Sequence, residues 1–182
     1  MLKEIKLDYN LTTFLPPKAD YSIHKGTCLA HQLDELTDIH KEYGLGETYH
    51  EDNTTIQQLW YTDAQVDYKE LGEQLGMEVI TVSSILQPPG NVIALHRDTF
   101  FQINKRFPDD KRTKVRANLY LEDWKVGHMI QYQDINDGKK WKTSDNWKAG
   151  DGFIWSSDVL HLSANAGMKD KYTLQVSGFS VD

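Results

Sequence analysis

Short segments with strand patterns follow one another from Glu78 to the end of the chain, separated by turn residues, and the first, Glu78–Leu86, is rich in Val, Ile and Ser. Pro88, Pro89 and Gly90 form one such turn signal, and Gly150 with Asp151 forms another. The expected strands are Glu78–Leu86, Val92–Asp98, Thr113–Leu121, His128–Gln133, Lys139–Lys142, Gly152–Trp155 and Tyr172–Val181. Many short strands at this spacing predict a β-sandwich or a small barrel.

The residues before this region have a different pattern, in which apolar residues recur at helical intervals. We expect helices over Cys28–Tyr43 and Thr62–Leu75, the second ending at Gly76. The chain of 182 residues has the length of one domain. We therefore expect one domain over 1–182, with 1–76 as a helical and loop support and 77–182 as the β core.

Composition restricts the class of partner. The formal net charge is −7, whereas a general nucleic-acid binder needs a basic face, so a nucleic-acid partner is disfavoured. Cys28 is the single cysteine, which excludes an internal disulfide and fits a reducing cytoplasm. No signal peptide is visible at the N-terminus, and no apolar run approaches a membrane span. We expect a cytoplasmic protein without a membrane partner.

Three residues point to a metal site. His96 and Asp98 are two positions apart on an expected strand, so both side chains lie on one face while Arg97 lies on the other. His161, which follows the expected strand Gly152–Trp155, is the best candidate for a third ligand. Two histidines and one carboxylate form the facial triad that holds Fe(II) and leaves coordination positions open. A His-x-Asp tripeptide alone often arises by chance, so the hypothesis of a metal site rests on the joint pattern with His161.

Polar residues alternate with apolar ones on two expected strands. Arg116, Asn118 and Tyr120 share one face of Thr113–Leu121, opposite a face of Val, Ala and Leu. Lys171, Thr173 and Gln175 likewise share one face of the last strand. Two interpretations stay open: either these faces are exposed on one side of an antiparallel sheet, or they are buried and bind a dicarboxylate. In the second case, Lys171 or Arg116 pairs with a carboxylate, and Thr173 or Tyr120 donates a hydrogen bond.

Residues from about Ile80 to Val181 resemble the Fe(II)/2-oxoglutarate-dependent oxygenases. The segments that carry the resemblance are Pro88–Asp98, Lys148–Trp155, His161–Asn165 and Lys171–Leu174. The resemblance implies a mainly β fold with supporting α-helices around a double-stranded β-helix core, which is the jelly-roll, cupin-like architecture. It also implies that His96, Asp98 and His161 are the metal ligands and catalytic residues.

Within that superfamily the chain looks most like the aspartyl/asparaginyl β-hydroxylase branch. In that branch the second metal histidine is followed by an Asn and, ten residues after the histidine, by a basic residue, and Asn165 and Lys171 match them. In that branch an Arg on the strand after the first metal ligand also contacts the cosubstrate, and Arg116 is at the matching position. Asn118 is at a position where that branch usually has His. The branch commonly lacks the carboxylate ligand, whereas Asp98 is present, and it usually has Arg at the position of Lys171.

The function that this resemblance implies is hydroxylation of an unactivated C–H bond. The cofactors are Fe(II), 2-oxoglutarate as cosubstrate and O2, and the co-products are succinate and CO2. The substrate is a peptide side chain, an amino acid or another small metabolite. The presence of Asp98 favours hydroxylation, because halogenating relatives replace this carboxylate. Two alternatives remain: a cupin-like metal enzyme that does not use 2-oxoglutarate, and a non-catalytic ligand-binding jelly roll.

Overall fold

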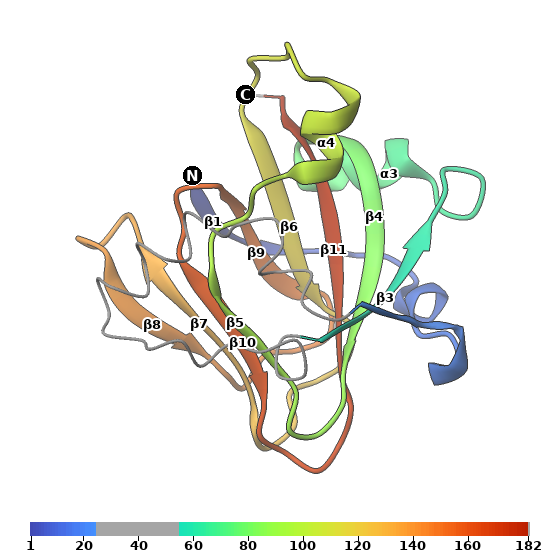
Figure 1. Cartoon of the computed structure of the whole chain (residues 1–182), viewed down its shortest axis with the longest axis vertical. Coiled ribbons are helices and arrows are strands. Elements are labelled where there is room, and N and C mark those ends of the chain that lie inside the picture. The colour runs from blue at the N-terminus through green and yellow to red at the C-terminus, as the bar shows by residue number, and fades with distance from the viewer. Residues whose placement is uncertain (25–54, 182) are drawn as a thin grey trace.

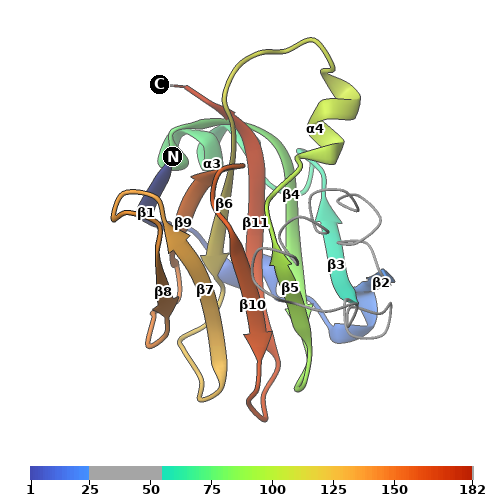
Figure 2. The same cartoon turned by 60° about the vertical axis from the view of Figure 1, so that its left-hand side comes forward.

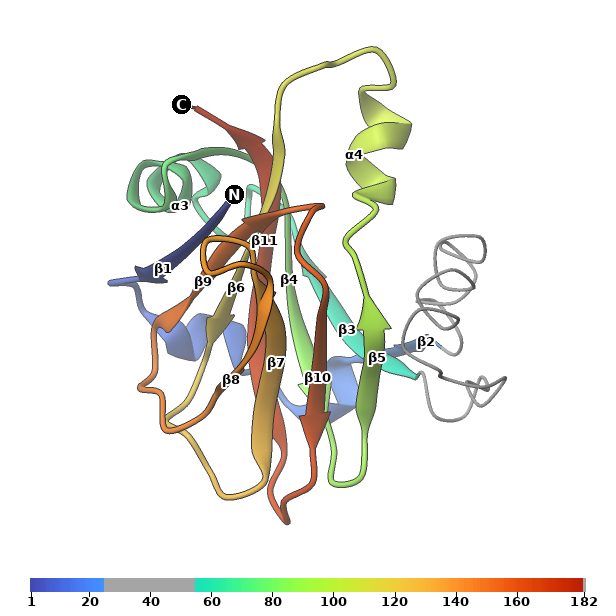
Figure 3. The same cartoon turned by 90° about the vertical axis from the view of Figure 1, so that its left-hand side faces the viewer.

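Two antiparallel β-sheets that face each other form the body of the protein (Figure 1). The computed structural model describes residues 1–24 and 55–181, so the helix expected over Cys28–Tyr43 lies outside the described residues. The large sheet has seven strands in the order β1-β9-β6-β11-β4-β3-β2, and the small sheet has four in the order β5-β10-β7-β8. Figures 2 and 3 show β7, β10 and β5 running in front of β6, β11 and β4.

The strands of the large sheet come from both halves of the chain. They are β1 (Leu2–Lys6), β2 (Ser22–His24), β3 (Ile56–Tyr61), β4 (Met77–Gln87), β6 (Lys114–Tyr120), β9 (Asp151–Ser156) and β11 (Lys171–Ser180). The small sheet contains β5 (Val92–His96), β7 (His128–Asp134), β8 (Lys140–Ser144) and β10 (His161–Asn165). Two 3-10 turns, η1 (Leu11–Phe14) and η2 (Lys18–Asp20), and two helices, α3 (Tyr68–Leu75) and α4 (Phe101–Arg106), complete the described elements.

The order of the strands confirms the expected fold class. From β4 to β11 the chain crosses from one sheet to the other at each connection, except at the β7–β8 hairpin. Such a path winds two antiparallel sheets into a double-stranded β-helix, or jelly roll. Because the other connections cross to the opposite sheet, residues distant in sequence meet between the two sheets.

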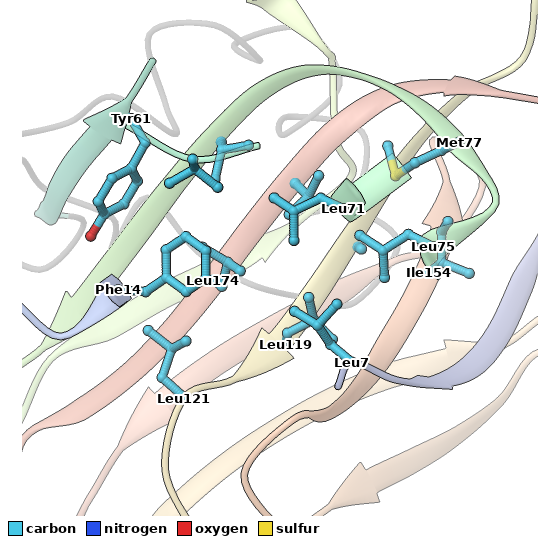
Figure 4. Close-up of a cluster of buried hydrophobic side chains, with 14 of the residues drawn as sticks. Leu7, Phe14, Tyr61, Leu71, Leu75, Met77, Leu119, Leu121, Ile154 and Leu174 are labelled. Carbon is cyan, nitrogen blue, oxygen red and sulfur yellow. The ribbon is translucent and has the colours of Figure 1, made fainter. Parts of the chain in front are cut away.

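An apolar cluster covers the outer face of the large sheet, on the side away from the small sheet. Val115, Ala117 and Leu119 of β6 lie in it together with Leu174 and Val176 of β11. Side chains from the N-terminal region complete the cluster: Leu7, Phe14, Tyr61, Leu71 and Leu75 (Figure 4). The alternation on β6 therefore places its polar residues on the inner face, toward the small sheet.

The N-terminal residues contribute more β structure than the sequence predicted. We expected strands only after Glu78, but β1 pairs with β9 and β3 pairs with β4, which extends the large sheet at both edges. Their sequences lack a clear signal: Leu2–Lys6 is charged at three of five positions, so pairing with a neighbouring strand determines its conformation. Helix α4 was also not predicted.

Helix α3 is shorter than expected and begins at Tyr68 instead of Thr62. The Asp67 side chain accepts a hydrogen bond of 2.9 Å from the Glu70 backbone N–H, which caps the helix. Residues before this cap form a turn in which Thr62 accepts from Val66. The predicted end is confirmed, because Gly76 has a φ of 67° and terminates the helix in the left-handed conformation. No helix within 1–24 or 55–181 is long and apolar enough to cross a membrane.

The packing of α3 against the large sheet gives a testable expectation. Leu71 is completely buried in the apolar cluster, so Leu71→Ala leaves a cavity and should lower the free energy of unfolding by about 2–5 kcal/mol. Glu73 on the same helix has a side chain that is 69% exposed, so Glu73→Ala should change it by less than about 0.5 kcal/mol. Urea denaturation measures both. Equal effects of the two substitutions would contradict the packing described.

Candidate metal centre

His96, Asp98 and His161 meet at one end of the space between the sheets. His96 is the last residue of β5 and His161 is the first of β10, and the two are direct register partners on these antiparallel strands. Their ring centroids are 4.2 Å apart. Asp98 follows two residues after β5, and its Oδ2 lies 3.9 Å from Nε2 of His161. One ligand atom of each residue lies within 4.8 Å of the others, and all three residues are buried.

Backbone carbonyls determine which nitrogen of each histidine is available. Nδ1 of His96 lies 2.6 Å from the Ala94 carbonyl oxygen, and Nδ1 of His161 lies 3.0 Å from that of Val159. A carbonyl oxygen only accepts, so each Nδ1 carries the proton and donates it. Each Nε2 then has a free lone pair, the arrangement in which a neutral histidine binds a metal.

Two donors from the large sheet hold the carboxylate of Asp98. Trp155 on β9 donates its indole N–H to Oδ2 at 2.9 Å, and the Arg116 guanidinium on β6 donates to Oδ1. Arg116 also donates to Ser177 Oγ at 2.9 Å. Trp155 additionally packs on the His161 ring, with centroids 4.4 Å apart. The large sheet thus orients a carboxylate that follows the small-sheet strand β5.

Burial and the Arg116 guanidinium determine the protonation states of the three triad residues. Burial alone would raise the pKa of Asp98, but the Arg116 guanidinium and the neighbouring histidines outweigh it and lower that pKa. Burial lowers the pKa of His96, and burial with the neighbouring His96 lowers the pKa of His161 to about 3. At neutral pH the site therefore offers two neutral nitrogens and one anionic oxygen, which is a donor set suited to a divalent transition metal.

The polar faces predicted on β6 and β11 lie inside the protein. Asn118 is 7% exposed, Tyr120 1%, Lys171 1% and Thr173 6%, which excludes the interpretation that these faces are exposed to solvent. Along the inner face, Arg116 pairs in register with Ser177, Asn118 with Gln175 and Tyr120 with Thr173. Polar side chains therefore line the large sheet from the triad toward Lys171.

Lys171 is a buried lysine whose Nζ has no carboxylate partner among the described residues. Its Nζ donates to the Met129 carbonyl oxygen at 2.8 Å, to Ser163 Oγ at 2.5 Å and to Gln87 Oε1 at 3.3 Å. Burial lowers its pKa to about 7. A buried cation that has neutral acceptors and no counter-charge is a site that an anion would stabilise.

The remaining residues predicted to bind the cosubstrate lie between the triad and Lys171. Asn118 has a buried Nδ2 without a hydrogen-bond partner in the part of the chain that the structure describes. The Tyr120 hydroxyl donates to Ser144 Oγ at 2.8 Å, and its ring stacks on Trp147 at 3.8 Å. Asn165 instead donates to the carbonyl oxygens of Gln87, at the end of β4, and of Lys169, in the turn after β10.

Sequence reasoning missed several side chains of this site. Ser163 lies two residues after His161 on the same strand, so strand alternation could have identified it. Trp155 had a weaker signal, because a tryptophan beside a strand end is usually core packing. Gln87 gave no local signal, since its contact with Ser163 joins residues 76 positions apart.

Comparisons with known proteins support the fold. No protein-family model and no curated protein matches the chain. A prolyl-4-hydroxylase from Pseudomonas putida is similar in structure, with 20% identity and a TM-score of 0.50 over 94% of this chain and 100% of that chain. The likeness shows a shared jelly-roll fold.

Two non-heme, α-ketoglutarate-dependent enzymes of nogalamycin biosynthesis are also similar. The carbocyclase SnoK has 12% identity and a TM-score of 0.51 over 97% of this chain and 85% of that chain. The epimerase SnoN has 15% identity and a TM-score of 0.51 over 88% of this chain and 78% of that chain. The aspartyl/asparaginyl β-hydroxylase branch that the sequence suggested is not shown by these comparisons.

The ion pair between Arg116 and Asp98 predicts how substitutions of these two residues change the free energy of unfolding. Arg116→Gln leaves a buried carboxylate without its cation and should lower the free energy of unfolding by about 3–5 kcal/mol at neutral pH. Adding Asp98→Asn removes the uncompensated charge and should restore most of the loss. Urea denaturation of the metal-free proteins measures both.

The pH dependence has a definite sign. Without Arg116, burial raises the pKa of Asp98, so the folded state binds more protons than the unfolded state and gains stability as the pH falls. The difference in free energy of unfolding between the single and double variants should therefore be smaller at pH 5 than at pH 7. A single variant as stable as wild type, or a double variant no better than the single one, would contradict this role of Arg116.

Proposed function

We propose that this protein is an Fe(II)- and 2-oxoglutarate-dependent oxygenase that hydroxylates an unactivated C–H bond of a small molecule or a peptide. One observation supports the proposal most strongly. The space between the sheets has a two-histidine, one-carboxylate cluster at one end and, farther along the same inner face, a buried lysine without a counter-anion. A metal and a dicarboxylate would satisfy both features. The similar α-ketoglutarate-dependent structures are consistent with it.

His96, Asp98 and His161 would hold the metal. Their donor atoms are buried, close together and in the protonation states that a divalent cation requires. Arg116 and Trp155 orient the carboxylate, and the carbonyls of Ala94 and Val159 orient the imidazoles. Three protein ligands leave coordination positions open for other molecules.

When bound, iron and 2-oxoglutarate supply the oxidation: 2-oxoglutarate, O2 and R–H become succinate, CO2 and R–OH. The protein residues bind, orient and exclude water. Lys171 would pair with the distal carboxylate of 2-oxoglutarate, and binding of that anion would favour the protonated ammonium form. Asn118 has an unused amide N–H on the way to Lys171, and Thr173 and Tyr120 flank the same path.

Arg116 is the rival anchor that the sequence suggested. Its guanidinium already binds Asp98 and Ser177, whereas Lys171 binds only neutral acceptors among the described residues. We therefore assign the cosubstrate carboxylate to Lys171. A cupin-like enzyme that does not use 2-oxoglutarate would not explain why Lys171 is buried without a carboxylate partner among the described residues. Cytoplasmic location and the absence of a nucleic-acid partner remain predictions.

Anaerobic reconstitution tests the reaction class. Wild-type protein with Fe(II) and 2-oxoglutarate should show a visible charge-transfer band and, after addition of O2, should release succinate slowly even without substrate. His96→Ala should abolish both signals, since it removes a ligand. His24→Ala, on the edge strand β2, should retain both.

Folded, iron-loaded wild type that shows neither signal would favour the cupin-like or non-catalytic alternative. A band that persists in the His96→Ala, His161→Ala double variant would show that the metal binds elsewhere.

The anchor is tested by Lys171→Met, which removes the charge and keeps most of the side-chain volume. We expect the 2-oxoglutarate concentration for half-maximal succinate release to rise at least about tenfold, because a charge-assisted contact is lost. In wild type, binding should weaken as the pH rises above about 7, where free Lys171 loses its proton. Lys171→Met should lose this dependence, and the exposed-site control Lys140→Met should keep it.

Unchanged cosubstrate dependence in Lys171→Met, together with a rise in Arg116→Met, would move the anchor to Arg116.

A further inference from the structure

A small cavity opens next to the triad, between β3, β5 and α4. Its volume is about 150 Å³. His96, Asp98 and Arg116 form its inner end. Other described residues that line it include Ile56, Gln58, Trp60, Ile85, Ile93 and Phe100. Any substrate that reaches the triad through this cavity contacts these side chains first.

The charges in this cavity are already compensated. Among its described lining residues, the ionisable side chains are His96, Asp98 and Arg116. Asp98 and Arg116 form an ion pair with each other, and Nδ1 of His96 donates to the Ala94 carbonyl oxygen. The remaining described lining consists of apolar, amide and hydroxyl side chains. A charged group placed here would lose its hydration without gaining a counter-charge, which is unfavourable.

Trp60 gives the cavity an aromatic wall. On β3, Leu59 and Tyr61 pack into the outer cluster, so alternation directs Gln58 and Trp60 toward the inner face. The Gln58 side chain donates to Ser83 Oγ at 2.9 Å, and this hydrogen bond fixes Gln58 beside Trp60. Trp60 is 44% exposed, a large apolar surface at the mouth of a functional cavity. An aromatic ring in this place suits a flat or cyclic apolar partner.

The cavity volume limits the size of that partner. An engineered apolar cavity of about 150 Å³ in another protein holds benzene. The cavity beside the triad has about that volume, so one ring fits within it.

We propose that the part of the substrate presented to the triad is an uncharged, largely apolar group about one ring in size, with Trp60 as the specificity-determining contact. This inference rests on the proposed function and narrows its substrate class. It disfavours free zwitterionic amino acids and carboxylate or ammonium side chains as the group that enters the cavity.

Three compounds with the same ring and different charge test the proposal: cyclohexanecarboxamide, cyclohexanecarboxylate and cyclohexylmethylammonium. Each is titrated into full-length protein loaded with Mn(II) and 2-oxoglutarate under anaerobic conditions. Broadening of the ring-proton NMR signals by Mn(II) reports binding near the metal without any turnover. The carboxamide should bind at least about tenfold more tightly than either charged compound.

Trp60→Ala should weaken carboxamide binding about tenfold, whereas Trp141→Ala should not change it. Trp141 is a matched control, because it is 41% exposed and lies on β8 outside the described lining of the cavity. Equal or tighter binding of a charged compound would overturn the inference. Equal effects of the two tryptophan substitutions would also overturn it, as would carboxamide signals that Mn(II) does not broaden.

Succinate release by the Fe(II)-loaded protein separates this inference from the proposed function. If succinate is released but the compounds show no preference for the neutral form, only the substrate class is wrong. If Mn(II) does not bind and no succinate is released, the proposed function is wrong and this inference falls with it.

Discussion

The buried carboxylate of Asp98 is the constraint on which the rest of the site depends. An ionised carboxylate in the interior is stable only with a cation and hydrogen-bond donors. Asp98 receives them from Arg116 on β6 and Trp155 on β9, while it lies beside His161 of the small sheet. One residue therefore connects the two sheets and aligns the potential metal ligands.

The same physical argument applies along the rest of the inner face. An ordinary β-sandwich fills the space between its sheets with apolar side chains, but here Asn118, Lys171 and Thr173 are buried there. Such burial costs stability unless partners are present. The larger apolar cluster lies on the outer face of the large sheet, where α3 and the N-terminal residues cover it (Figure 4), and a second cluster that includes Tyr132 and Phe153 packs between the sheets beside Trp155. The space between the sheets thus contains both apolar packing and a row of buried polar side chains.

Much of this arrangement could be predicted from local patterns. Period-two alternation correctly placed Arg116, Asn118 and Tyr120 on one face, and the His96-x-Asp98 spacing with His161 identified residues that do converge. Alternation could not show which face is inside, because that depends on what packs against the sheet. β1 and β3 were missed since their strand conformation depends on pairing with distant strands. The contacts of Trp155 and Gln87 were missed for the same reason: both are tertiary.

We propose that the triad and Lys171 bind the two ends of one 2-oxoglutarate molecule. A crystal structure of the protein grown anaerobically with Mn(II) and 2-oxoglutarate tests it most directly. We expect one metal ion bound by His96, Asp98 and His161, with the keto-acid end of 2-oxoglutarate at the metal and its distal carboxylate at Lys171. A metal bound by other residues, or a distal carboxylate paired with Arg116 while Lys171 keeps its present partners, would contradict this assignment of the site.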